Sequence, residues 1–91
     1  MASVATNQEY MIKRKLWIKS NPIRKARKKH DLTLTQAASI IGVSLLSLNL
    51  WEQGNAQPKP ENLNRAARAL KIAPEEMEAQ WKEWDKRRPT F

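Results

Sequence analysis

Residues 33 to 41 alternate between apolar and polar positions with the period of a short helix. Thr33 lies three positions before Gln36, which is the spacing of a capping box, where each side chain bonds the backbone N–H of the other residue. Small and aliphatic residues then recur at helical spacing: Ala37, Ala38 and Ile41. Gly42 follows, and glycine tolerates the left-handed conformation that commonly ends a helix. The pattern predicts a helix of about two turns.

A second short helix is predicted directly after Gly42. Ser44 is its candidate N-cap, Leu48 and Trp51 form a stripe at i and i+3 that faces the core, and Gly54 is the next stop signal. Two short helices joined by a Gly-Val-Ser turn are typical of a helix-turn-helix.

Further helices are predicted on both sides of this motif. One begins at Pro22 and runs to about Lys29, a second begins near Glu61, and a third runs from about Pro74 to the residue before Pro89. Proline suits the first turn of a helix, because its missing N–H would have no partner there. The sequence therefore predicts an all-α fold of five compact helices with an elongated C-terminal helix.

The charge of the chain is unevenly distributed. The 91 residues carry a formal net charge of +8: segment 1–30 carries +8, segment 31–57 carries −2, segment 58–73 carries +3 and segment 74–91 carries −1. The basic surface thus flanks the helix-turn-helix. This layout suits a polyanionic partner whose phosphates are neutralised by Lys and Arg, and the alternative is a basic, solubilising face.

The composition also argues against several classes of protein. There is no cysteine and only one histidine, so neither a disulfide framework nor a thiolate metal site is expected. The sequence has no Gly-rich phosphate loop, and its carboxylates cluster in the last helix without pairing into a site, so an enzyme is not expected. No secretory or membrane-spanning segment is recognised. We expect a cytoplasmic protein with no cofactor, metal or small-molecule ligand.

The run from Ile23 to Met77 resembles the phage-repressor/Cro-type (XRE-like) helix-turn-helix domain, without gaps over about 55 residues. The positions that carry the resemblance are Arg24, Arg27, Leu32, Thr33, Gln36, Ala38, Gly42, Val43, Ser44, Leu48, Trp51, Glu52, Gly54, Pro58, Leu63, Ala67, Ala69, Leu70 and Met77. The resemblance implies a nucleoid-associated, sequence-specific regulator that binds double-stranded DNA, most simply a repressor that occupies its operator as a homodimer. It also implies that Arg27 pairs with Glu52 and ties the first helix to the recognition helix.

The outer face of the recognition helix departs from the family pattern. The residues expected to face bases are Leu45, Leu46, Asn49 and Leu50. Three of these positions are leucine, as is Leu34 at the start of the preceding helix, whereas polar or basic side chains are usual at these positions in the family. In one interpretation Asn49 contacts adenine and the leucines contact thymine methyl groups. In the other, the leucines form a protein interface of an antitoxin-like or adaptor subunit.

Phosphate contacts are expected from basic and polar side chains around the motif: Lys13, Arg14, Lys15, Lys25, Lys28, Gln53, Asn55, Gln57 and Lys59. Three of these lie in the segment from Glu9 to Ser20, whose periodicity suits either a helix or two short extended pieces. This segment could follow the DNA backbone as an arm, or it could pack Leu16, Trp17 and Ile18 onto the domain; the two roles are compatible.

The predicted organisation is a basic N-terminal extension at residues 1–21, a helix-turn-helix DNA-binding domain at residues 22–88 and a tail at residues 89–91. Within the last helix, Met77, Trp81 and Trp84 lie on one face. Trp81 and Trp84 either cover the core, against Leu16 or Trp17, or form a dimer contact, since aromatic residues are enriched at interface hot spots.

Overall fold

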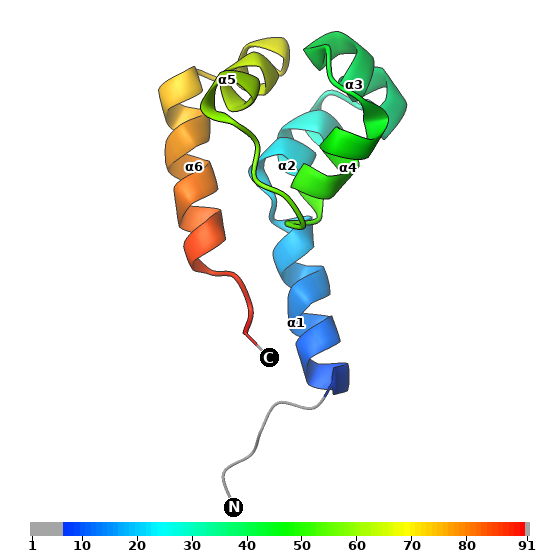
Figure 1. Cartoon of the computed structure of the whole chain (residues 1–91), viewed down its shortest axis with the longest axis vertical. Coiled ribbons are helices and arrows are strands. Elements are labelled where there is room, and N and C mark those ends of the chain that lie inside the picture. The colour runs from blue at the N-terminus through cyan, green and yellow to red at the C-terminus, as the bar shows by residue number, and fades with distance from the viewer. Residues whose placement is uncertain (1–6, 91) are drawn as a thin grey trace, which may run out of the picture.

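The computed structural model describes residues 7–90, and within that range the chain is all-α, with six helices and no strand. The helices are α1 (Asn7–Lys19), α2 (Pro22–Lys29), α3 (Leu34–Ile41), α4 (Leu45–Glu52), α5 (Pro60–Ala69) and α6 (Pro74–Lys86). Figure 1 shows α2 to α6 gathered into one body from which α1 projects. The five predicted helices are all present, and α1 is the sixth. Residues 1–6 of the predicted extension and residue 91 of the predicted tail lie outside the described part.

The segment that periodicity left open is a single helix, α1. Its last turns reach the core through Trp17, whose side chain is buried, and Ile18 packs partly against the same core. Leu16 instead points to solvent and is 62% exposed, so the expectation that it packs onto the domain was wrong for this residue. Met11 and Ile12 are also exposed. The division at residue 21 stays a prediction, although Trp17 belongs to the common core.

Helix starts and ends follow the local signals in the sequence. Both hydrogen bonds of the Thr33–Gln36 capping box are present, and the Ser44 hydroxyl accepts from the backbone N–H of Ser47 at the start of α4. Gly42 and Gly54 have φ angles of +84° and +71°, in the left-handed region that favours glycine. These predicted boundaries are confirmed. They could be predicted from the sequence because each depends on contacts within a few residues.

The core lies between all six helices. Its buried side chains are Trp17, Ile23, Ala26, Ala37, Ala38, Ile41, Leu48, Trp51, Leu63, Ala66, Ala67, Leu70, Met77, Trp81 and Trp84. Helix α6 packs against α5 and α2, while α3 packs against α4 and α5. The apolar stripes predicted for α4 and α6 therefore both face this core.

The two tryptophans of α6 are core residues. Trp84 is 2% exposed and stacks on Trp17 with the ring centroids 3.9 Å apart and the rings parallel. Trp81 is 5% exposed and lies with its ring centroid 4.9 Å from that of Trp84. The packing alternative, with Trp17 as the partner, is thus confirmed, and little ring surface remains for contact with a second molecule.

Among residues 7–90, no single helix is long and apolar enough to cross a membrane. Taken together, the two helices of the bent pair α3–α4 are long and apolar enough, by length and composition alone.

Candidate nucleic-acid interface

Helices α3 and α4 form a compact, sharply bent pair. The chain bends by 110° between them at the Gly-Val-Ser turn, within the range of about 90–120° that is typical of a helix-turn-helix. Ala37 and Ala38 are buried on α3, and their small side chains allow the neighbouring helices to approach closely. The guanidinium of Arg65 on α5 donates to the carbonyl oxygen of Gly42 at 3.1 Å, which ties the turn to the rest of the domain.

An ion pair fixes the C-terminal end of α4 to α2. The Arg27 Nε donates to Glu52 Oε2 at 2.8 Å, and Nη2 donates to Oε1 at 2.9 Å. The two side chains are only 8% and 3% exposed. Nη1 of Arg27 also donates to the carbonyl oxygen of Leu32 at 2.8 Å, so the pair anchors the loop before α3 as well. A bidentate pair of this kind fixes orientation as well as distance.

Asn21 makes a second connection between α2 and α4. Its side-chain oxygen caps α2 by accepting from the N–H of Arg24, and its Nδ2 donates to the carbonyl oxygen of Trp51 at 3.2 Å. The side chain is completely buried. Sequence reasoning did not find the bond to Trp51, because this partner is remote in the chain and leaves no local pattern.

The outer face of α4 is less apolar than its sequence indicated. Leu45 and Leu46 are 48% and 67% exposed, whereas Leu50 and Leu34 are half-buried, and Leu34 packs against the core. Of these four leucines, only Leu45 and Leu46 are exposed. Asn49 is half-buried beside them.

The amides of Asn49 and Gln53 are coupled. Gln53 Nε2 donates to Asn49 Oδ1 at 3.1 Å, across one turn at the end of α4. This bond orients both side chains, so that the Nδ2 donors of Asn49 and the Oε1 acceptor of Gln53 are presented together. An amide donor beside an amide acceptor matches the hydrogen-bonding edge of a base such as adenine.

The cations predicted to meet phosphates lie at the surface. Lys25 and Lys28 are exposed on α2, Lys59 is exposed at the start of α5, and Lys13 and Lys15 are exposed on α1. These lysines lie on α1, on α2 and at the start of α5, in separate parts of the sequence.

Two other predicted phosphate contacts are engaged within the protein. Arg14 Nη2 donates to the carbonyl oxygen of Gln53 at 3.0 Å and to Asn55 Oδ1 at 2.8 Å. The Gln57 side chain donates to Asp85 Oδ1 at 3.1 Å and accepts from the Trp81 indole at 2.9 Å. Both side chains hold the loop that follows α4.

The same loop is held by Arg88, which sequence reasoning did not single out. Arg88 Nη1 donates to the carbonyl oxygen of Gly54 at 2.9 Å, and Nη2 donates to Asp85 at 3.0 Å. Gly54 also lies against the ring of Trp17, where a Cβ atom would overlap the indole. No local signal marks these contacts, since all of them except the Arg88–Asp85 bond join segments far apart in the chain.

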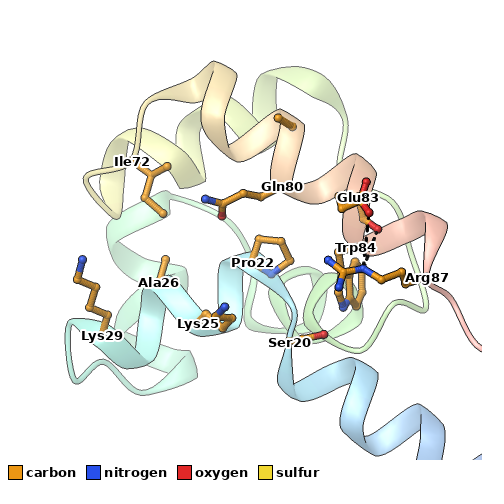
Figure 2. A pocket seen from close by; sticks show the side chains of 11 residues that line it. Ser20, Pro22, Lys25, Ala26, Lys29, Ile72, Gln80, Glu83, Trp84 and Arg87 are labelled. Atoms are coloured by element: carbon orange, nitrogen blue, oxygen red, sulfur yellow. Dashed lines mark hydrogen bonds and ion pairs between the residues drawn. The ribbon is translucent and has the colours of Figure 1, made fainter.

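A separate open groove lies between α2 and α6 (Figure 2). Pro22, Ala26, Ile72 and Trp84 provide apolar lining. Charged and polar residues that also line it are Ser20, Lys25, Lys29, Gln80, Glu83 and Arg87. No residue of α3 or α4 contributes, so this groove is distinct from the helix-turn-helix face.

Comparison with known proteins supports the interpretation of the α3–α4 geometry. A family model described as helix-turn-helix matches residues 23–77. The chain belongs to this family. The resemblance to Cro/C1-type (XRE-like) domains is thereby confirmed, and membership places the helix-turn-helix protein among DNA-binding regulators. No curated protein matches the sequence, and no solved structure matches it. The matched residues begin in α2 and end in the first turn of α6, so α1 and the tryptophans of α6 lie outside the match.

Proposed function

We propose that this helix-turn-helix protein binds specific sequences in double-stranded DNA through α4 and represses transcription by occupying its operator. The observation that carries the proposal is the α3–α4 pair, bent by 110° and fixed from behind by the Arg27–Glu52 ion pair. A helix held in this way can enter the major groove without first becoming ordered. Binding then loses less conformational entropy than it would for a flexible segment.

Base contacts are assigned to the outer face of α4. Asn49, together with Gln53, supplies the hydrogen-bonding groups for an A·T pair, and Leu45, Leu46 and Leu50 supply apolar contact with thymine methyl groups. These contacts favour an operator that is rich in A·T pairs. The exposed cations of α1, α2 and α5 supply most of the affinity through the phosphates.

Repression would require only that the protein occupies its operator. A symmetric dimer reads two half-sites about 34–36 Å apart, one helical turn of DNA, and so covers a stretch of promoter. The net charge of +8 gives two copies a reason to associate on DNA, where phosphates neutralise their repulsion, in preference to free solution. Trp81 and Trp84 are 5% and 2% exposed, so the dimer contact of this proposal is made by side chains other than these two rings.

The experiment is selection of bound sequences from a randomised duplex pool, after fluorescence-anisotropy titration of the pool at two salt concentrations. The proposal predicts a steep loss of affinity with salt and enrichment of an A·T-rich inverted repeat. A duplex that carries one half-site should bind more weakly than the full repeat. Enrichment of single sites bound by one copy would contradict the dimer but not the DNA binding.

A second candidate function rests on the exposure of Leu45 and Leu46. Two leucines about half and two-thirds exposed on one turn suit a protein partner as well as thymine methyl groups. In this alternative the protein is an antitoxin-like or adaptor subunit, and the complex is stoichiometric and insensitive to salt. Sequence-indifferent, weak binding in the selection would favour it.

A further inference from the structure

The loop that follows the recognition helix is held by α1, which lies outside the family match. Arg14 on α1 donates through one nitrogen, Nη2, to the carbonyl oxygen of Gln53 and to Asn55 Oδ1, at 3.0 and 2.8 Å. These residues are 39 and 41 positions away from Arg14 in the sequence. Asn55 is thus bonded twice, because its backbone N–H also donates to the carbonyl oxygen of Leu50 in α4 at 2.9 Å.

The base of α1 fixes Arg14 over this loop. Trp17, one turn beyond Arg14, stacks on Trp84 and lies against Gly54, and the Arg88 guanidinium lies 4.8 Å from the centroid of the Trp17 ring. Arg88 also donates to the Gly54 carbonyl oxygen. Because Trp17 is clamped on several sides, α1 cannot swing away from the loop without opening the core.

We propose that Arg14 is a positioning residue that sets how the loop meets the DNA backbone; this inference rests on the proposed DNA-binding function. The Asn55 oxygen is turned toward Arg14, so the NH₂ group of the same side chain is the part that meets an outside acceptor. Phosphate oxygens accept hydrogen bonds and do not donate them. Asn55 is therefore held in the orientation that suits a phosphate.

The positioning role of Arg14 differs from the direct phosphate contact that the charge of this residue suggests. A phosphate contact needs a cation at the right place, and lysine would serve. The positioning role depends on the reach and the planar shape of the guanidinium, whose Cζ lies 5.5 Å from the centroid of the Trp17 ring; a lysine side chain is shorter and has no planar group to lie against that ring. Charge and geometry can therefore be separated by one conservative substitution.

The first test compares wild type with Arg14→Lys. In the free protein, we expect the backbone amide hydrogen of Asn55 to exchange with solvent about tenfold faster in the variant than in wild type, since the loop loses a charge-assisted hydrogen bond. We expect DNA affinity to fall about tenfold while the slope of log affinity against log salt stays the same, because lysine keeps the positive charge of arginine. Lys15→Gln, which removes an exposed cation from the same helix, is the control and should leave the Asn55 exchange rate unchanged.

The second test changes the group that faces outward. Asn55→Asp keeps an oxygen acceptor for Arg14 but replaces the NH₂ donor by a second oxygen. We expect slow exchange in the loop to persist while DNA affinity falls at least tenfold, on account of repulsion from phosphate. This variant is informative even if Arg14→Lys proves less stable overall, since it retains the Arg14 bond.

Three results would count against these statements in different ways. If Arg14→Lys matches wild type in both exchange and affinity, Arg14 acts only as a cation and the inference is overturned. If Asn55→Asp binds DNA as well as wild type does, the assigned orientation of Asn55 is wrong. If wild type itself shows no salt-dependent DNA binding, the proposed function fails, and the exchange rates then show separately whether Arg14 orders the loop.

Discussion

The indole N–H of Trp17 donates to the carbonyl oxygen of Trp84, and the indole N–H of Trp84 donates to the carbonyl oxygen of Trp17; both bonds are 2.7 Å long. The rings stack in parallel, although the residues are 67 positions apart. Both indole donors are buried, so each needs a partner, and each residue supplies the partner of the other. This reciprocal pair joins α1 to α6 and makes α1 part of the fold.

Trp17→Ala should therefore cost about 3–5 kcal/mol in the free energy of unfolding, as expected for removing a large buried aromatic side chain. Its neighbour Leu16 is 62% exposed, and Leu16→Ala should change stability by less than about 0.5 kcal/mol. Urea denaturation followed by tryptophan fluorescence and by circular dichroism measures both variants. Equal, small effects of the two substitutions would mean that α1 is not part of the cooperative unit.

Glu52→Gln should destabilise the protein by about 3–5 kcal/mol, because it leaves the buried Arg27 without its carboxylate. The double variant Arg27→Met with Glu52→Leu should recover much of that loss, since neither charge then has to be desolvated. Chemical denaturation of the two variants and wild type provides the comparison. The bond from Arg27 to the Leu32 carbonyl oxygen persists in Glu52→Gln and is lost in the double variant. If the double variant is no more stable than Glu52→Gln, that bond contributes more to stability than the ion pair does.

The two glycines with positive φ should respond unequally to alanine. Gly42→Ala should cost about 1–2 kcal/mol from backbone strain, because the nearest obstacle to a Cβ atom is the flexible end of Arg65. Gly54→Ala should cost about 1–3 kcal/mol more, because its Cβ atom would meet the ring of Trp17, which is stacked and cannot move aside. Thermal unfolding monitored by circular dichroism measures the difference. Similar losses at both positions would show that the Trp17 ring yields easily.

Asn49→Ala and Lys28→Gln should alter DNA binding in different ways. Loss of the Asn49 amide should weaken binding by about 1–3 kcal/mol at one A·T position of the operator and relax selectivity there. Loss of the Lys28 charge should weaken binding to all sequences evenly and reduce the salt slope by about 1. Anisotropy titrations with the selected operator and with single-base variants separate these effects. Unchanged selectivity in Asn49→Ala would remove this residue from base recognition.

Much of the fold could be predicted because its signals are local. The Thr33–Gln36 capping box, the Ser44 cap and the glycine stops each act within one helical turn, where sequence spacing fixes spatial proximity. Helix α1 was harder to predict. Met11, Ile12 and Leu16 face solvent, and Trp17 alone reaches deep into the core. Periodicity cannot identify a helix whose burial depends on one residue.

The candidate site divides in the same way. Family spacing pointed to Arg27 and Glu52, and helical periodicity placed Asn49 on the outer face of α4. It did not show that Leu34 and Leu50 would be half-buried; Leu34 packs against a core built from residues remote in the chain. Nor did it indicate that Arg14 and Gln57, selected as polar groups for phosphate, would bond Asn55 and Asp85.

The sequence by itself determined the approximate bounds of α2 to α6, that a helix-turn-helix lies between residues 33 and 54, and that basic segments flank it. These properties depend on short-range hydrogen bonds, side-chain periodicity and the count of charges. Only the tertiary structure decided that α1 is anchored by Trp17 against Trp84 and that Arg14 reaches the loop beyond α4. The reason is physical: such contacts depend on the relative placement of helices 39 to 67 residues apart, which no local pattern encodes.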